Sequence, residues 1–254
     1  MRITIIGSGN LGYHLAKKLN IANRNTITIV NPSNNVGLKK LKKNQIKTIL
    51  GIENIPIDSD VYIICVKDNA IKKVADALYK KKIQKTVLHT SGATASEVLK
   101  RFNSYGVLYP LQTFKTNQAV NWKETPLFLE YSDLKTKKII TKVAKILSEK
   151  ITYTTSEHRL LLHLCAVLVN NFTNAIYHSA YQLLGKRKKE FDYLLPIIHQ
   201  TLTNIEKFTP DTTQTGPAIR KDKYTIDKHL KVLSQYKEIK KIYLTLTQYI
   251  QTSL

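Results

Sequence analysis

Residues 3 to 12 constrain the fold of this chain more than any other stretch. Ile3 to Ile6 form a β-branched run typical of a buried strand, and a G-x-G-x-x-G turn follows, leading directly into a helical pattern. In such a turn the first glycine permits a sharp bend, the second admits a phosphate, and the third lets helix and strand pack closely. The helix N-terminus then offers free N–H groups to an anion. We therefore expect a dinucleotide to be held by Gly7, Ser8, Gly9, Asn10, Leu11 and Gly12, although an ordinary glycine-rich turn has the same spacing.

Strand and helix patterns alternate from the N-terminus to about residue 154. Buried-strand patterns occur at 26–30, 47–50, 61–66, 86–88, 106–108, 126–130 and 151–153. This alternation is typical of a doubly wound, mostly parallel sheet of the Rossmann type. From residue 155 onward the patterns are helical, and the first helix runs from Ser156 to a terminating glycine, Gly185. We therefore predict an α/β fold with a cofactor-binding domain over 1–154, an all-helical C-terminal domain over 155–254, and a substrate cleft between them.

The end of the second predicted strand bears on the choice of dinucleotide. In NAD-binding Rossmann domains an acidic residue commonly stands here and bonds the ribose hydroxyls. This strand ends in Asn31-Pro32-Ser33, without a carboxylate to repel a 2′-phosphate, and both Asn31 and Ser33 carry hydrogen-bond donors. We therefore favour NADP over NAD as the cofactor. A plain turn explains the same three residues.

Further cofactor contacts are expected where later strands end at the same edge of the sheet. The strand 61–66 brings Val66 there, and the strand 86–88 is followed by His89, Ser91 and Gly92. Hydroxyl and main-chain groups at this edge suit a ribose, a pyrophosphate or a carboxamide. For His89, a buried structural role is equally compatible with the sequence.

The long predicted helix carries polar residues on an otherwise apolar surface. At about 100° per residue, His163, Asn170, Asn174 and Tyr181 fall near one line. Buried polar groups need partners, so this stripe indicates either a hydrogen-bond network between helices or subunits, or residues that face a substrate. Under the second interpretation His163, Asn170 and Asn171 are catalytic. Hydride transfer to a carbonyl or imine needs a donor for the developing charge, and histidine suits that task.

A loop in the helical region contains a candidate anion-binding residue. Thr215-Gly216-Pro217 precedes Arg220, and a guanidinium can bind a carboxylate or phosphate through two parallel hydrogen bonds. We therefore include Arg220 among the candidate catalytic residues and expect a small substrate with an anionic group. A surface ion pair with Asp222 is the alternative.

The charge of the chain bears on macromolecular partners. The formal net charge is +22 over 254 residues, which fits either phosphate neutralisation on a nucleic acid or a composition that leans generally toward lysine. The lysines are scattered over predicted helix faces and are not interleaved with aromatic residues. We therefore expect no specific nucleic-acid partner.

Cysteine usage and hydropathy bear on location. Cys65 and Cys165 are too few and too far apart for a disulfide framework or a metal site, and Met1-Arg2 leads straight into the first strand. We therefore expect a cytoplasmic protein without a metal. The stretch from Leu160 to Leu184 comes nearest to a membrane span, but its histidines and asparagines would be costly in lipid. We interpret it as a buried helix of a soluble protein and expect no membrane partner.

Four motifs follow the glycine turn in order: HTSGA at 89–93, YPLQTF at 109–114, HLCAVLVNNF at 163–172 and TGPAIRKDKYTIDKHL at 215–230. Over essentially the whole chain, they resemble a family of Rossmann-like proteins joined to a helical domain of unknown function 2520. That family is distantly similar to pyrroline-5-carboxylate reductases and β-hydroxyacid dehydrogenases. The resemblance implies an NADP-dependent oxidoreductase and a homodimer whose helical domains pack together. It implies no particular substrate.

Two departures from these relatives bear on the reaction. β-Hydroxyacid dehydrogenases carry a catalytic lysine four residues before an asparagine, whereas Ala166 and Val167 stand four residues before Asn170 and Asn171. Neither residue has a side-chain amine, which disfavours oxidation of a hydroxyacid. Reduction of a small carbonyl or imine is therefore the expected reaction. Tyr109 stands where the family pattern has histidine. The alternative function is a sensor or scaffold that binds NADPH without turnover.

Overall fold

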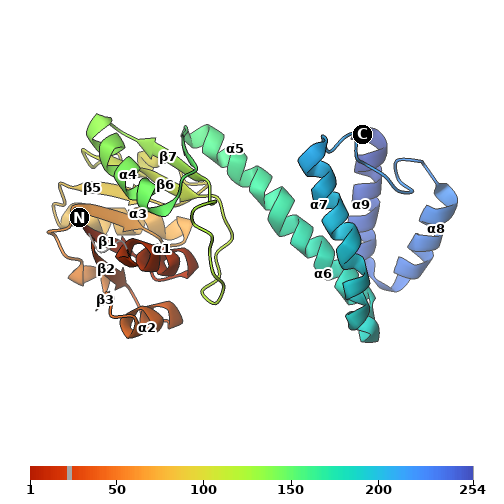
Figure 1. Ribbon diagram of the computed structural model, residues 1–254, viewed down its shortest axis with the longest axis horizontal. Coiled ribbons are helices and arrows are strands. Elements are labelled where there is room, and N and C mark those ends of the chain that lie inside the picture. The colour runs from red at the N-terminus through yellow and green to blue at the C-terminus, as the bar shows by residue number, and fades with distance from the viewer. Residues whose placement is uncertain (22–24, 254) are drawn as a thin grey trace. The chain divides into compact units, whose positions relative to one another are not determined.

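The computed structural model describes residues 1–21 and 25–253, which form two compact units. The first unit spans Met1–Val169 and the second begins at Asn170. The colour ramp of Figure 1 separates them, with the first unit running from red to green and the second in blue-green and blue.

The first unit is built on an eight-stranded sheet with the order β3-β2-β1-β4-β5-β6-β7-β8. The strands are β1 (Arg2–Ile6), β2 (Thr26–Asn31), β3 (Lys47–Leu50), β4 (Val61–Ile64), β5 (Thr86–His89), β6 (Tyr105–Pro110), β7 (Leu127–Tyr131) and β8 (Ile151–Tyr153). Neighbouring strands run parallel except β6 and β7, which are antiparallel. The predicted doubly wound, mostly parallel sheet is confirmed. The strand order reverses at β1, since β2 and β4 flank it, and ligands bind beside such a reversal.

Helices cover both faces of this sheet (Figure 1). The apolar side chains of α1 (Asn10–Ile21), α2 (Val36–Lys43) and α4 (Leu134–Leu147) share one core, and α3 (Asp68–Lys80) packs into the other. Successive residues of β1 supply both cores, because Ile5 belongs to the first and Ile6 to the second. A strand buried on both faces reads as a continuous apolar run, which is why these strands were recognisable from sequence.

The second unit confirms the predicted all-helical region over its described residues. Its elements are α6 (Thr173–Leu183), η4 (Gly185–Leu194), α7 (Leu195–Lys207), α8 (Lys223–Val232), η5 (Leu233–Gln235) and α9 (Lys237–Ser253). The segment η4 is 3₁₀-helical apart from Arg187, whose φ and ψ are not helical, and α7 begins directly after it, at Leu195. In the first unit, a short 3₁₀ segment, η2 (Ser96–Leu99), lies between β5 and β6.

The long predicted helix consists of three helical segments. α5 (Ser156–Ala166) begins after Thr155, whose hydroxyl accepts a hydrogen bond from the His158 N–H. A π-helical segment, η3 (Val167–Phe172), follows and continues into α6. A π-helix has more residues per turn than an α-helix. The uniform spacing behind the predicted polar stripe therefore does not hold across η3.

The prediction that this helix is buried is wrong for the single chain. Leu160, Leu161 and Leu164 are 48%, 56% and 53% exposed. Among residues 1–21 and 25–253, the span Ser156–Leu183 is the one stretch long and apolar enough to cross a membrane by length and composition, with mean hydropathy 1.4. Apolar composition shows that a surface needs cover, and it leaves open whether the same chain or another molecule supplies that cover.

Candidate functional site

The glycine turn after β1 has the geometry of a phosphate-binding turn. Gly7 has a φ of +109°, and a side chain at this position would lie 2.2 Å from the Cys65 carbonyl oxygen. A side chain at Gly12 would lie 2.0 Å from the Gly7 carbonyl oxygen, so α1 packs directly on the turn. By contrast, nothing lies within 4 Å of the position of a Cβ on Gly9. The turn is therefore closed toward the sheet and open where a pyrophosphate is expected to approach the helix N-terminus.

Side-chain amides hold the end of β2 against this turn. Asn31, which is buried, accepts a hydrogen bond from the Ser8 N–H at 2.9 Å and donates one to the Ser33 carbonyl at 2.6 Å. The Ser8 hydroxyl donates to Asn35 Oδ1, which also caps α2 by accepting from the Leu38 N–H. Asn31 thus shapes the turn, whereas Ser33 is exposed. The sequence reasoning missed Asn35, although asparagine just before a helical pattern is a preferred cap.

A hollow of about 350 Å³ lies where α2 meets β3. Its lining includes Asn34, Lys39 and Lys42 and contains no carboxylate among the described residues. Its Asn34 lies in the loop after β2, and residues at the end of this strand commonly contact the adenine ribose in Rossmann folds.

The loop after β5 is held mainly by its own groups. His89 is fully buried, and its Nδ1 accepts from the Ser91 N–H at 3.2 Å. The Ser91 hydroxyl accepts hydrogen bonds from the N–H groups of Ala93 and Thr94. Burial, with the positive charge of Arg159 nearby, lowers the pKa of His89 to about 3. His89 is therefore neutral and inaccessible, as the structural interpretation of this residue expects, and Ser91 supports the loop through its hydroxyl.

Arg159, which the sequence reasoning missed, fastens α5 to the same loop. Its side chain is fully buried, and all five of its N–H groups have partners. The acceptors are Glu130 Oε1, the carbonyl oxygens of Ser91, Gly92 and Thr94, and the Ser156 hydroxyl. Glu130 Oε2 in turn accepts from Ser156 at 2.7 Å. A glutamate within an otherwise buried strand pattern was the available signal, because a buried carboxylate needs a cation.

One turn after Arg159, the side chain of His163 reaches the edge of the sheet. Its Nδ1 lies 3.0 Å from the Tyr109 hydroxyl at the end of β6. Both rings lie against Gly92, where a Cβ would be 2.6 Å from His163 Nδ1 and 2.9 Å from Tyr109 Cζ. The structure therefore brings together His163, Tyr109 and Gly92, which belong to three of the four sequence motifs.

The remaining predicted residues divide between the two units. Val66 lies beside the turn, with its Cγ1 3.1 Å from the position of a Cβ on Gly7. Asn170, Asn171 and Arg220 belong to the second unit and are exposed. Their assignment to catalysis stays a prediction.

The alternative interpretation of Arg220 as half of an ion pair is not borne out in the described residues. No salt bridge joins Arg220 to Asp222 there. Instead Asp222 caps α8, accepting from the Thr225 N–H at 3.0 Å and from its hydroxyl at 2.7 Å. These hydrogen bonds, with a smaller contribution from the Arg220 charge, lower the pKa of Asp222.

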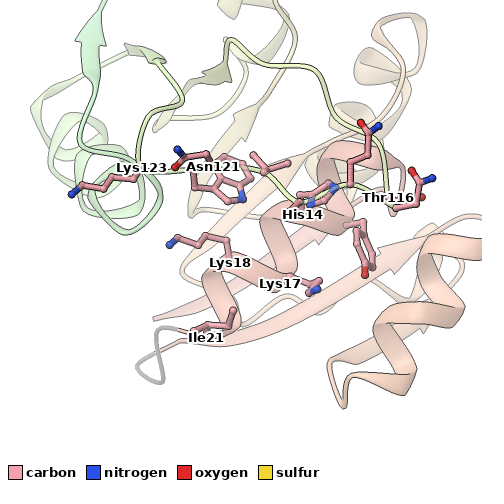
Figure 2. A pocket seen from close by; sticks show the side chains of 13 residues that line it. His14, Lys17, Lys18, Ile21, Thr116, Asn121 and Lys123 are labelled. Atoms are coloured by element: carbon pink, nitrogen blue, oxygen red, sulfur yellow. The ribbon is translucent and has the colours of Figure 1, made fainter. Parts of the chain in front are cut away.

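A separate groove of about 540 Å³ runs along the outer face of α1. One wall carries His14, Lys17 and Lys18, and the loop 116–123 forms the other (Figure 2). The His14 Nε2–H donates to the Lys115 carbonyl at 2.8 Å, which ties the loop to the helix. Lysines also line hollows on α2, α4 and α8. Positive charge alone therefore does not mark this groove as a ligand site, and it fits a general leaning of the composition toward lysine.

Two candidate groups thus lie in the first unit: the glycine turn after β1, and His163 beside the loop after β5. The turn can receive phosphates, and the imidazole stands at the sheet edge. No group of three or more histidine, cysteine or acidic side chains suited to a metal occurs among residues 1–21 and 25–253.

Comparison with known families divides the chain into two matched regions. Residues 2–91 match a family model described as NADP oxidoreductase, coenzyme F420-dependent, and residues 125–250 match the domain of unknown function DUF2520. No curated protein matches the chain.

Solved structures resemble the whole chain. The chain is 31% identical to a putative NADP oxidoreductase from Bacteroides fragilis, covering 98% of this chain and 97% of that one with a TM-score of 0.92. A Plasmodium falciparum pyrroline carboxylate reductase with NADP bound is 12% identical, with coverages of 99% and 98% and a TM-score of 0.61. A Streptomyces aurantiacus imine reductase is also 12% identical, with coverages of 99% and 96% and a TM-score of 0.63. The last two likenesses show a shared fold.

Proposed function

Because this chain belongs to the family of Rossmann-like NADP oxidoreductases that end in a DUF2520 domain, we propose that it reduces a small carbonyl or imine compound with NADPH. The observation that carries this proposal is the placement of His163 against Gly92, in the loop that follows β5. That loop begins at the carboxyl end of β5, which is the ligand-binding edge of a parallel sheet. The fold neighbours that are reductases of imines or of pyrroline carboxylate support the substrate class.

The residues around the turn fit a dinucleotide with a 2′-phosphate. Gly9 leaves room for the pyrophosphate, and the N-terminus of α1 supplies N–H groups to it. The hollow beside α2 offers Lys39 and Lys42, with no carboxylate among its described lining residues. A phosphate would be attracted here, whereas an acidic residue that selects NAD is missing. NADP is accordingly the proposed cofactor.

His163 is the proposed hydrogen-bond donor to the substrate. Bound NADPH would supply a hydride, which places negative charge on the carbonyl oxygen or neutralises a positively charged imine. An imidazole N–H positioned at that atom stabilises the developing charge, and solvent supplies the proton that completes an alcohol. The lysine that serves hydroxyacid oxidation in other relatives has no counterpart at Ala166 or Val167. Reduction is therefore the proposed direction.

Calorimetric titration with NADPH and with NADH tests the cofactor. We expect tighter binding of NADPH, by about tenfold or more for one added charge-assisted contact. Equal or tighter binding of NADH contradicts the preference, and failure to bind either contradicts the proposal as a whole.

Turnover is tested by following NADPH oxidation with cyclic imines, ketoacids and aldehydes. We expect His163→Ala to lower kcat by about 10²-fold or more. His158→Ala, on the exposed side of the same helix, is the matched control and should retain activity. NADPH binding without oxidation by any substrate class would instead favour the sensor.

We further propose that the second unit is covered by a second copy of this chain. Among its described residues, Ala218 and Leu233 are the buried apolar side chains. Several helices expose apolar side chains, and on α7 these include Ile197, Leu202 and Ile205. A unit that buries so little apolar surface lacks the main stabilising contribution to folding. A homodimer joined through this unit supplies that cover symmetrically.

A further inference from the structure

We propose that Tyr109 holds His163 in one tautomer: the Tyr109 hydroxyl donates to His163 Nδ1, and the imidazole carries its proton on Nε2. Tyr109 is then a positioning residue, which determines which ring nitrogen of His163 is a donor. The catalytic meaning of this contact rests on the proposed function, but the tautomer itself does not.

The geometry leaves little rotational freedom to the two rings. The hydroxyl and Nδ1 are 3.0 Å apart, and the rings meet edge to face with centroids 6.0 Å apart and planes inclined by 78°. Gly92 lies under both, with no room even for a Cβ. On the other side of Tyr109, the ring of Phe128 on the neighbouring strand lies 6.4 Å away between centroids. Tyr109 is 8% exposed and is therefore fixed within the protein.

Counting donors and acceptors favours one direction for this hydrogen bond. A tyrosine hydroxyl has one proton to donate, and a neutral imidazole has one N–H and one bare nitrogen. Among the interactions of the described residues, His163 Nδ1 is the acceptor at hydrogen-bond distance from the Tyr109 hydroxyl. If Nδ1 carried the proton instead, the hydroxyl would accept from it, and its own proton would need another acceptor or water at this half-buried position. Donation by Tyr109 needs no such further partner.

The surrounding charges keep Tyr109 a donor. Burial raises the pKa of Tyr109, the negative charge of Asp68 raises it further, and the positive charge of Arg159 opposes both. The hydroxyl thus stays protonated at neutral pH. The Arg159 guanidinium does not compete for His163 Nδ1, because its five N–H groups are directed to Glu130, Ser156 and the loop 91–94.

A direct test is nuclear magnetic resonance of the ¹⁵N-histidine-labelled protein, in which the two nitrogen shifts of each imidazole identify the protonated atom. The spectrum of His163→Gln assigns the His163 signals. We expect wild-type His163 to be the Nε2–H tautomer, and Tyr109→Phe to convert it to a mixture of tautomers. Tyr105→Phe removes a hydroxyl from the other end of β6 and is the matched control, expected to leave the His163 signals unchanged.

Finding the Nδ1–H tautomer in the wild type overturns the proposal, and so does a His163 spectrum that Tyr109→Phe leaves unchanged. The wild-type result decides the tautomer even if Tyr109→Phe fails to fold. Once a substrate is known, Tyr109→Phe should lower kcat about tenfold, part of the range for a positioned donor, with NADP affinity within about twofold of wild type. Lack of any turnover would count against the proposed function and leave the tautomer result standing.

Discussion

The two units differ in how far their amphipathic helices bury their apolar faces. In the first unit, α4 carries an amphipathic pattern and buries Ile140, Val143 and Leu147 against the sheet. In the second, α7 carries a comparable pattern and buries none of its side chains, with Leu202 and Ile205 53% and 47% exposed. An amphipathic pattern therefore predicts that a helix face is covered, but it does not identify what covers it.

The difference follows from how each unit acquires a core. Strands of the first unit pair with one another and create two apolar faces, which local helices can cover immediately. The described residues of the second unit form no strand, and an isolated helix gains little from its own hydrogen bonds. At about 25 cal/mol per Å² of apolar surface, the uncovered side chains forgo much of the available stabilisation. The proposed second copy would restore it.

The largest expected effect comes from charging the exposed face of α7. Leu202→Glu with Ile205→Glu should convert a dimer into a species of about the monomer mass, 29.0 kDa, and should reduce helical circular dichroism. Each buried carboxylate would replace an apolar anchor worth about 2 kcal/mol or more at an interface. Light scattering after size exclusion measures the mass.

The control for α7 is Ile57→Glu, which charges a side chain of the first unit that is 66% exposed. We expect this variant to remain dimeric. The proposed dimer would be refuted by a wild-type chain that is monomeric at micromolar concentration while its second unit is fully folded.

Breaking the buried ion pair of the first unit should have a smaller effect than charging α7. It should lower the free energy of unfolding by more than breaking an exposed ion pair does. Arg159→Met leaves Glu130 buried without its cation and should lower the free energy of unfolding by about 3–5 kcal/mol. Arg101→Met removes an exposed pair with Asp76 and should cost less than about 1 kcal/mol. Urea denaturation compares them. If both substitutions lower the free energy of unfolding equally, Arg159 does not anchor α5 to the sheet and the loop as described.

The same contrast explains how far sequence reasoning reached. The strands of the first unit were predictable because apolar runs such as Ile3 to Ile6 need no knowledge of distant partners. The glycine turn was predictable for a similar reason, since its geometry is local. Arg159 was missed because its partner Glu130 lies far away in sequence. Asn35 carries a local signal as the cap of α2, and only its contact with Ser8 depends on a distant residue. The exposure of the long helix was missed because an apolar pattern does not identify what covers it.

A smaller effect is expected from pH, through His89 of the first unit. Its pKa falls from about 6.5 in the unfolded chain to about 3 in the folded protein. Between these values the unfolded state binds the extra proton, so stability is fully present above pH 6.5 and declines as pH falls toward 3. His89→Asn should flatten this part of the stability curve, measured by denaturation between pH 7 and 4. An unchanged slope would mean that other groups dominate it.

The smallest expected effect concerns helix caps, where the two units offer a matched pair. Asn35→Ala removes the cap of α2 and should destabilise the first unit by about 1 kcal/mol. It also removes the acceptor of the Ser8 hydroxyl, so NADP affinity should fall, by about threefold to tenfold for one displaced contact in the turn. Asp222→Ala removes the cap of α8, which belongs to the second unit. Its NADP affinity should match the wild type, measured by the same titration. If both variants lose NADP affinity equally, the loss comes from lower overall stability. The specific link from Asn35 through Ser8 to the phosphate-binding turn is then wrong.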